Sequence, residues 1–158
     1  MGRELLVLVK HDCETCRLVL PCLDAAVRAG ATLRILSQST RDETDALSAR
    51  LGLGPMELDP ELSYSERFDP DAVPVLVLLE DDRELDRVEG FERARFELLA
   101  EAADVKLDLA DLPASRPGCA SRARDPDVEA ELRARRARRE GRIRSRSLRI
   151  GGLEDEQE

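Results

Sequence analysis

The residues of this chain whose spacing could carry chemistry are Cys13 and Cys16, which are separated by Glu14 and Thr15. They follow the apolar run 5–9 and open a segment with helical periodicity, so we expect them at a strand-to-helix junction. A helix N-terminus directs free N–H groups and the positive end of its dipole at the first sulfur, which favours the thiolate. The second sulfur lies within disulfide reach of the first. The pattern predicts a dithiol redox site in which Cys13 attacks and Cys16 resolves the mixed disulfide.

Half of a zinc site has the same spacing, so a metal site is the alternative. His11, Cys13, Cys16 and Cys22 are four potential soft ligands. On a helix, Cys22 would lie about 9 Å along the axis from Cys16 and about 120° around it. This separation excludes a Cys16–Cys22 disulfide, and shared ligation would require Cys22 to turn back by a full helical turn. We therefore expect no metal and no cofactor, with Cys22 packed as a small apolar residue.

Composition argues for an ordinary folded protein. Four cysteines among 158 residues are too few for a disulfide-stapled secreted fold. The net charge of −9 argues against nucleic acid or an anionic membrane as the partner of the whole protein. The apolar run near the N-terminus is too short for a signal sequence or a membrane span. We expect a cytoplasmic protein with no membrane partner.

Apolar periodicity predicts an α/β domain over residues 1–105. A buried strand over 5–9, an amphipathic helix from Cys16 to Gly30 and a strand over 32–36 form a βαβ unit with parallel strands. Further on, the sequence predicts a helix over 41–51, one or two helical turns within 61–68, a strand over 75–79, its hairpin partner over 84–88 and a helix over 91–103.

The last of these helices has a predicted buried stripe. Apolar residues at helical spacing along it are Phe91, Ala94, Leu98 and Ala102. Phe96 lies off this stripe, and the sequence offers no account of it.

With these elements in order, the chain resembles the thioredoxin-fold superfamily over residues 4 to about 105. The residues that carry the resemblance are Cys13, Cys16, Pro21 within the first helix, Val73-Pro74 before the third strand, and Gly90 after the fourth. The resemblance implies a thioredoxin-like, four-stranded mixed sheet flanked by helices, with one strand before the cysteines as in glutaredoxin-like proteins. It also implies a cis Pro74 beside the disulfide and a Val73 backbone that pairs with an extended substrate segment, so Val73 and Pro74 would shape the substrate groove.

The chain departs from the thioredoxin pattern around the cysteines. Thioredoxins usually have Trp where this chain has Asp12, Gly-Pro where it has Glu14-Thr15, and a buried acid where it has Val7. Cys16 therefore lacks an evident proton acceptor. His11 either fills that role in part or is a solvated loop histidine.

The acidic neighbours lead to two predictions about Cys13. Asp12 and Glu14 should oppose its thiolate and make the couple more reducing, which favours a reductase of a specific protein partner over an oxidase. Because Cys13 stands at the helix N-terminus and Cys16 one turn inside, Cys13 should be the exposed thiol that alkylating agents label first.

Residues 106–158 differ in character and are predicted to form a linker followed by an Arg-rich extension. From Arg133 to Arg149 there are nine arginines and one acid. Such a segment cannot build its own core, so it is either disordered or docked on a partner, with RNA binding as a further alternative. Residues 126–150 would then contact a larger redox protein. The competing hypothesis for the chain is a non-catalytic thioredoxin-fold subunit whose C-terminal arm docks on such a protein.

Cys119 lies within the predicted linker, near Arg116, Arg122 and Arg124, which should favour its thiolate. An extended linker is long enough to bring Cys119 to Cys13. Cys119 is therefore either a relay that exchanges with the Cys13/Cys16 pair or an incidental free thiol.

Overall fold

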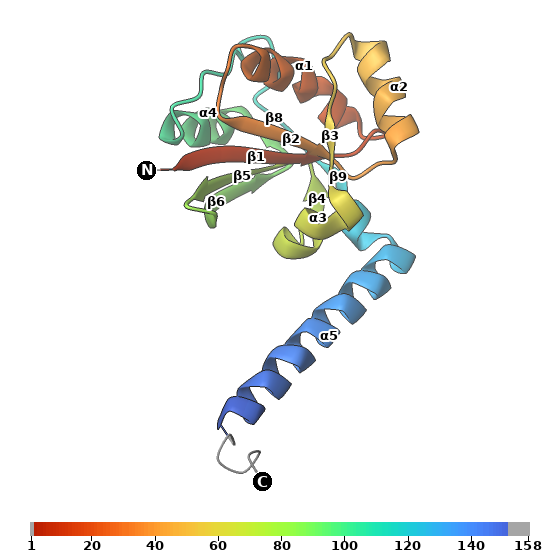
Figure 1. Cartoon of the computed structure of the whole chain (residues 1–158). Helices are drawn as coiled ribbons and strands as arrows, with labels where there is room; N and C mark the ends of the chain where they lie inside the picture. The colour runs from red at the N-terminus through yellow and green to blue at the C-terminus, as the bar shows by residue number, and fades with distance from the viewer. Residues whose placement is uncertain (1, 152–158) are drawn as a thin grey trace.

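The computed structural model describes residues 2–151 and contains a five-stranded mixed sheet (Figure 1). The strand order is β3-β2-β1-β5-β6. The central strand β1 (Arg3–Val9) is parallel to β2 (Leu33–Ser37) and antiparallel to β5 (Val75–Glu80). At the edges, β6 (Arg83–Glu89) is antiparallel to β5, and β3 (Glu57–Leu58) is parallel to β2. The sequence predicted the four longer strands, and the two-residue β3 adds a fifth strand to the four-stranded sheet expected.

The core lies on both faces of β1. Each residue from Leu5 to Val9 is at most 1% exposed, as expected for a continuous apolar run in a strand covered on both sides. Figure 1 shows α1 and α4 above the sheet and α3 below it. Burial on both faces explains why β1 has no polar residue between Leu5 and Val9.

The first two helices follow the sequence signals. In α1 (Glu14–Arg28), Cys13 is the N-cap, and the residues that face the core include Val19, Leu20 and Leu23. α2 (Arg41–Leu51) begins with a capping box between Thr40 and Glu43 and ends at Gly52, whose φ of 67° is left-handed. The predicted bounds of α2 are confirmed because cap residues mark both of its ends.

The 3-10 helix η1 (Pro60–Leu62) and α3 (Ser63–Phe68) provide the short helical turns predicted after residue 60. They precede β4 (Ala72–Val73), a two-residue strand that stands apart from the main sheet.

The buried face of α4 (Arg93–Ala102) differs from the predicted stripe. Leu98 is 61% exposed and Ala94 is also exposed, whereas Phe96 and Leu99 are at most 2% exposed. The prediction was wrong because Phe91 precedes the helix, in β7 (Phe91–Glu92), and so does not set its register. Phe96 packs edge-on against the Phe91 ring, with 4.9 Å between centroids.

Residues 106–125, predicted as a linker, are packed onto the domain. Leu109 and Ala123 are each 1% exposed. β8 (Ser115–Arg116) pairs with β7, β9 (Cys119–Ala120) pairs with β4, and the 3-10 helix η2 (Arg122–Arg124) follows. The domain boundary predicted at residue 105 is therefore corrected, because the folded unit continues past it.

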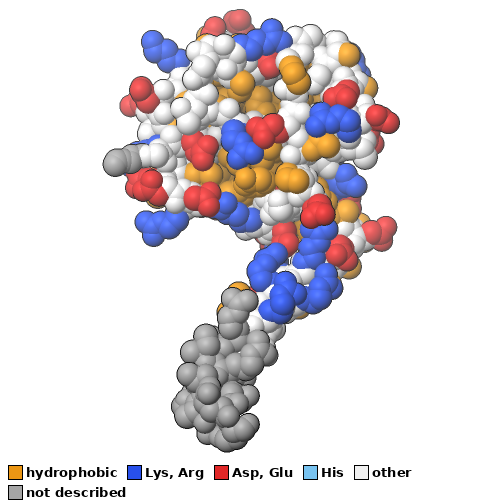
Figure 2. Space-filling model, in the orientation of Figure 1, with side chains coloured by type: hydrophobic (Ala, Val, Ile, Leu, Met, Phe, Trp, Pro, Cys, Tyr) orange, Lys and Arg blue, Asp and Glu red, His pale blue; other side chains and the backbone are white. Residues whose placement is uncertain are grey.

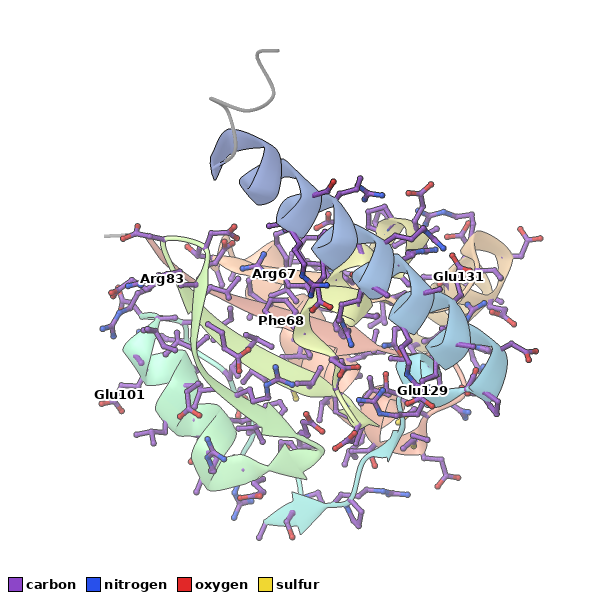
Figure 3. All side chains as sticks on the ribbon, turned by 90° about the horizontal axis from the view of Figure 1, so that it is seen from below. Arg67, Phe68, Arg83, Glu101, Glu129 and Glu131 are labelled. Carbon is purple, nitrogen blue, oxygen red and sulfur yellow. The ribbon has the colours of Figure 1, made fainter. Side chains whose placement is uncertain are left out.

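The long helix α5 (Pro126–Gly151) extends away from the sheet (Figure 1). Seen from below, α5 passes over α3, the helix that contains Arg67 and Phe68 (Figure 3). Leu132 is 3% exposed, and the Arg139 guanidinium lies 2.5 Å from the Glu66 carboxylate. The extension predicted as disordered or partner-docking is thus helical up to residue 151 and contacts the domain at its start. The rest of that prediction, over residues 152–158, lies outside the described residues.

Within residues 2–151, no helix combines the length and the apolar composition needed to cross a membrane.

Candidate functional site

The local fold places Cys13 at the junction of β1 and α1. Its sulfur accepts a hydrogen bond from the backbone N–H of Cys16 at 3.3 Å. This N–H is one of the donors that a helix N-terminus leaves free. The thiol also lies 3.5 Å from the carbonyl oxygen of Val73, to which it donates when protonated. Cys13 is thus the N-cap of α1 and touches the residue before Pro74.

The two cysteines titrate in opposite directions. The pKa of Cys13 is lowered to about 5, chiefly by the hydrogen bond from the Cys16 side chain, with further donors from the Cys16 backbone and from Cys119 outweighing its burial. Burial raises the pKa of Cys16 well above its usual value, and the neighbouring Cys13 adds to this. At neutral pH the site therefore holds a Cys13 thiolate and a protonated Cys16 thiol. This is the division between a nucleophile and a resolving thiol.

Val73 and Pro74 lie beside this pair. The peptide bond between them is cis, and Val73 is fully buried. The backbone of Val73 does not face an open groove, because β4 pairs with β9 in antiparallel register, with Val73 opposite Cys119. The strand edge that the resemblance assigned to a substrate is occupied here by this chain itself.

Residues 115–121, which we call the covering segment, are fixed over the cysteines by side chains from the opposite side of the site. The Thr15 hydroxyl donates to the carbonyl oxygen of Pro117 at 2.6 Å. The Lys10 ammonium donates to that of Ala120 at 2.7 Å, and Arg116 forms a 2.8 Å ion pair with Glu14. The segment is therefore tied to the two central residues of the Cys-x-x-Cys motif and to Lys10 before it.

A close backbone contact also holds the covering segment. A Cβ atom at Gly118 would lie 2.6 Å from the carbonyl oxygen of Val73 and 3.0 Å from Cα of Gly90. No side chain fits at this distance, so a glycine is required at position 118. Gly90, the thioredoxin-like glycine after the fourth strand, has its positive φ of 82° at the same contact.

The covering segment overturns the prediction that Cys13 is the exposed thiol. Cys13 and Cys16 are both 0% exposed, whereas Cys119 is partly exposed. The sequence places Cys13 at a helix end, but it does not show that residues a hundred positions later return to cover it. Alkylation of Cys13 in the folded protein therefore requires movement of the covering segment.

The electrostatic predictions need correction for the same reason. Glu14 pairs with Arg116, and neither Asp12 nor Glu14 is among the groups that shift the pKa of Cys13. Burial, then the hydrogen bond to Cys13, raise the pKa of Cys119. Arg116 therefore does not favour the Cys119 thiolate, and the remaining nearby arginines are held elsewhere, Arg122 by Gln38 and Arg124 by Asp69 and Asp71.

His11 does not serve Cys16 in this structure. Its Nδ1 lies 2.7 Å from the Ser39 hydroxyl, and its Nε2 lies 3.6 Å from the Glu43 carboxylate. Across residues 2–151, no hydrogen bond joins His11 to Cys13 or Cys16. The side chain is engaged with the start of α2, so it is neither an acceptor for Cys16 nor fully solvated.

Cys22 lies apart from the other cysteines. It is partly buried, and its pKa is raised by burial and by the charges of Asp108 and Asp111. Among the described residues, no group of three or more histidine, cysteine or acidic side chains is arranged to hold a metal ion.

Sequence reasoning missed Gln38, which anchors the end of the covering segment. This side chain is 1% exposed. Its amide nitrogen donates to the hydroxyls of Ser65 and Ser121, at 2.9 Å each, and its Oε1 accepts from the backbone N–H of Arg122 at 2.9 Å. No spacing signal in the sequence links position 38 to position 121. The glycine before Cys119 was the one local hint of a close backbone approach.

Comparison with known proteins supports the fold. No family model matches the chain, and no curated protein matches it. StoA from Bacillus subtilis has a TM-score of 0.51 and 13% identity, over 63% of this chain and 82% of that chain. A putative thiol:disulfide interchange protein DsbE from Chlorobium tepidum has a TM-score of 0.52 and 17% identity, over 65% and 79%. The exposed lipoprotein thioredoxin Etrx1 from Streptococcus pneumoniae has a TM-score of 0.50 and 20% identity, over 63% and 84%.

At sequence identities this low, the matches establish the fold but not the activity. The mixed sheet and its flanking helices are the part of the chain that these matches support. The resemblance drawn from the sequence is confirmed at this level, and the chain has the thioredoxin fold.

Proposed function

We propose that this chain is a thiol–disulfide oxidoreductase that acts on a protein substrate through Cys13 and Cys16. The observation that carries the proposal is that the pKa values of the two thiols are shifted in opposite directions. The pKa of Cys13 is lowered to about 5 at the N-terminus of α1, and that of the adjacent Cys16 is raised. Cys13 would attack a substrate disulfide as thiolate, and Cys16 would then displace the substrate and close the Cys13–Cys16 disulfide.

We further propose that the reaction runs as a reduction of a specific protein partner in the cytoplasm. The small number of cysteines favours a reducing compartment. A stabilised Cys13 thiolate makes the couple more oxidising, so the acidic flank no longer supports the reductive direction. The direction rests instead on the compartment, which would keep both thiols reduced and ready to attack a disulfide.

Trapping tests both proposals. In the double variant Cys16→Ser/Cys119→Ser, Cys13 should retain its partner as a mixed disulfide, because neither neighbouring thiol is left to resolve it. Cells expressing this variant would be quenched with acid and alkylated, and the captured protein would be identified by mass spectrometry. Cys13→Ser should capture nothing, and Cys22→Ser should behave as wild type. Capture of cytoplasmic proteins supports the location, and capture only of proteins from another compartment contradicts it.

One observation favours a second function, that of a non-catalytic subunit. Cys13 is covered, and α5 presents a basic arm that leaves the domain (Figure 2). Arg138, Arg142 and Arg144 are exposed on it. In this alternative, residues 126–150 dock on an acidic surface of a larger redox protein.

Redox cycling separates the two functions. A catalytic protein should form the Cys13–Cys16 disulfide in oxidised glutathione and lose it in dithiothreitol. A protein whose Cys13 and Cys16 remain thiols under all of these conditions is a binding subunit, and the oxidoreductase proposal is then wrong.

A further inference from the structure

Cys119 and Cys13 share one site although they are distant in sequence. Each thiol shifts the pKa of the other: Cys119 acts to lower the pKa of Cys13, and Cys13 raises that of Cys119. The backbone of Cys119 pairs with that of Val73, whose carbonyl oxygen lies 3.5 Å from the Cys13 sulfur. Cys13 is therefore next to two thiols, Cys16 on its own helix and Cys119 on the covering segment.

The N-terminus of α1 also acts on the Cys119 thiol. Hydrogen bonding from the backbone N–H groups of Thr15 and Glu14 acts to lower its pKa, although burial and Cys13 outweigh this effect in the reduced protein. Once Cys13 is part of a disulfide, it carries no negative charge. The contribution of Cys13 to the raised pKa then disappears, and the two backbone donors remain to stabilise a Cys119 thiolate.

The covering segment holds Cys119 in this position without the help of a disulfide. Its backbone is paired with β4, clamped by Thr15 and Lys10, and seated through Gly118. Preorganisation of this kind raises the effective concentration of one thiol near another. A flexible tail thiol would have no such advantage.

We propose that Cys119 is the third redox cysteine of this site and exchanges with the Cys13–Cys16 disulfide to form a Cys13–Cys119 disulfide. This inference rests on the proposed function, in which a substrate disulfide leaves as two thiols and oxidises Cys13 and Cys16. The Cys119 thiolate attacks the Cys13 sulfur and a Cys13–Cys119 bond forms. The Cys13–Cys16 bond breaks with its electron pair on Cys16, which takes up the proton that Cys119 released. One disulfide replaces another, so the step needs no further oxidant.

The product state differs from a Cys13–Cys16 disulfide in two ways. The covering segment becomes covalently attached to α1, and Cys16 returns to the thiol state. Two different oxidised forms of one protein then interconvert, and only the Cys13–Cys16 form leaves the covering segment free to move.

Disulfide mapping tests the inference. The reduced protein would be equilibrated in glutathione buffers of increasing oxidised fraction, quenched in acid, alkylated, digested and analysed by mass spectrometry. We expect wild type to contain both Cys13–Cys16 and Cys13–Cys119 links, Cys16→Ser only the second, and Cys119→Ser only the first. Cys22→Ser is the control and should match wild type, because Cys22 lies near Asp108 and Asp111 instead.

A matched pair of glycine variants tests the geometry. Gly118→Ala places a methyl group 2.6 Å from the Val73 carbonyl oxygen and must displace the covering segment. We expect it to lower the ratio of Cys13–Cys119 to Cys13–Cys16 by about tenfold or more, the scale of effect when a methyl group is forced into closely packed atoms. Gly141→Ala is the control, because nothing lies within 4 Å of a Cβ atom at that position.

The outcomes separate the inference from the function on which it rests. One outcome is that the Cys13–Cys16 disulfide forms in wild type, but Cys119 is recovered entirely as an alkylated free thiol, both in wild type and in Cys16→Ser. The inference is then wrong and the oxidoreductase function stands. If Cys119 pairs only between molecules, with a yield that rises with protein concentration, the inference is also wrong. If Cys13–Cys16 never forms under any buffer, the proposed function itself fails.

Discussion

Glu14 and Arg116 form an ion pair of 2.8 Å that joins the first residue of α1 to the covering segment. The side chain of Glu14 is 73% exposed, and its carboxylate is turned to the arginine. The acid next to Cys13 therefore contacts the covering segment and does not set the charge state of Cys13.

This arrangement predicts the behaviour of Glu14→Gln. The pKa of Cys13 should remain near 5, because the groups that lower it belong to Cys16 and Cys119. Stability should fall by no more than about 1 kcal/mol, since exposed ion pairs contribute little. The pKa would be measured from the ultraviolet absorbance of the thiolate, with Cys13→Ser as the blank. A lower pKa in Glu14→Gln would show that the acid opposes the thiolate after all.

The titration of Cys13 also predicts how stability depends on pH. Its pKa is about 5 in the folded protein and near the usual 9 in the unfolded chain, so the folded state loses the proton first. The resulting stabilisation is fully present above the unfolded pKa and is lost as pH falls through about 5. Denaturant unfolding of wild type and Cys13→Ser at several pH values should show a stability difference that shrinks with acidification. A constant difference would contradict the lowered pKa.

The buried face of α4 predicts unequal effects of two substitutions on one helix. Phe96→Ala removes a fully buried ring that packs on Phe91 and should cost about 3–5 kcal/mol. Leu98→Ala, at a position 61% exposed, should change stability by no more than about 0.5 kcal/mol. Urea unfolding followed by circular dichroism would measure both. A larger loss of stability in Leu98→Ala than in Phe96→Ala would support the buried stripe that was predicted from the sequence.

The position of Gln38 predicts that it controls the end of the covering segment. Gln38→Leu removes the amide donor to Ser65 and Ser121, which keep Asp59 and the N–H of Ala123 as partners. It leaves the N–H of Arg122 without its side-chain acceptor and should cost about 1–3 kcal/mol for that lost partner. Hydrogen exchange at Arg122 should become faster, while exchange within β1 changes less. Ser48→Ala is a suitable control, because that buried hydroxyl has no partner among the described residues. Equal effects of the two substitutions would contradict the anchoring role.

The contact between α5 and the domain predicts a dependence on Arg139. This guanidinium holds the pKa of the buried Glu66 below its usual value, so the pair stabilises the folded state above the ordinary carboxyl pKa and loses this effect on acidification. Arg139→Gln should raise the pKa of Glu66 and increase hydrogen exchange in α5. Arg138→Gln is the matched control, because Arg138 is more exposed and pairs with the surface residue Glu131. The same exchange pattern in both variants would show that Glu66 does not hold the helix.

Much of the sheet and the site could be predicted from local sequence, because local signals determine them. The cap residues Thr40 and Gly52 mark α2, and continuous apolar runs mark β1 and β5. Cys13 and Cys16 fall at a strand-to-helix junction, which the apolar run before them and the helical periodicity after them predicted. In each case the residues that decide the structure are neighbours in the chain.

The cover over the site could not be predicted in this way. β4 and β9 are two-residue strands, too short to show a period, and what pairs them is a glycine contact between Gly118 and Val73. The arginine-rich composition around Cys119 suggested an ionised thiol, but burial and Cys13 raise its pKa instead. Tertiary placement overrides composition at this position, and the exposure of Cys13 was mispredicted for the same reason.

The contacts of the covering segment have a consequence for the order of folding. Thr15 and Pro117 are 102 positions apart, and Lys10 and Ala120 are 110 apart. Such contacts close loops of more than 100 residues, so we expect them to form after the sheet has assembled. The same contacts are then expected to open first in the native protein, by a local transition that leaves β1 and its neighbours intact. The buried sulfur of Cys13 can therefore become accessible without global unfolding, at a frequency that the stability of this last-formed segment determines.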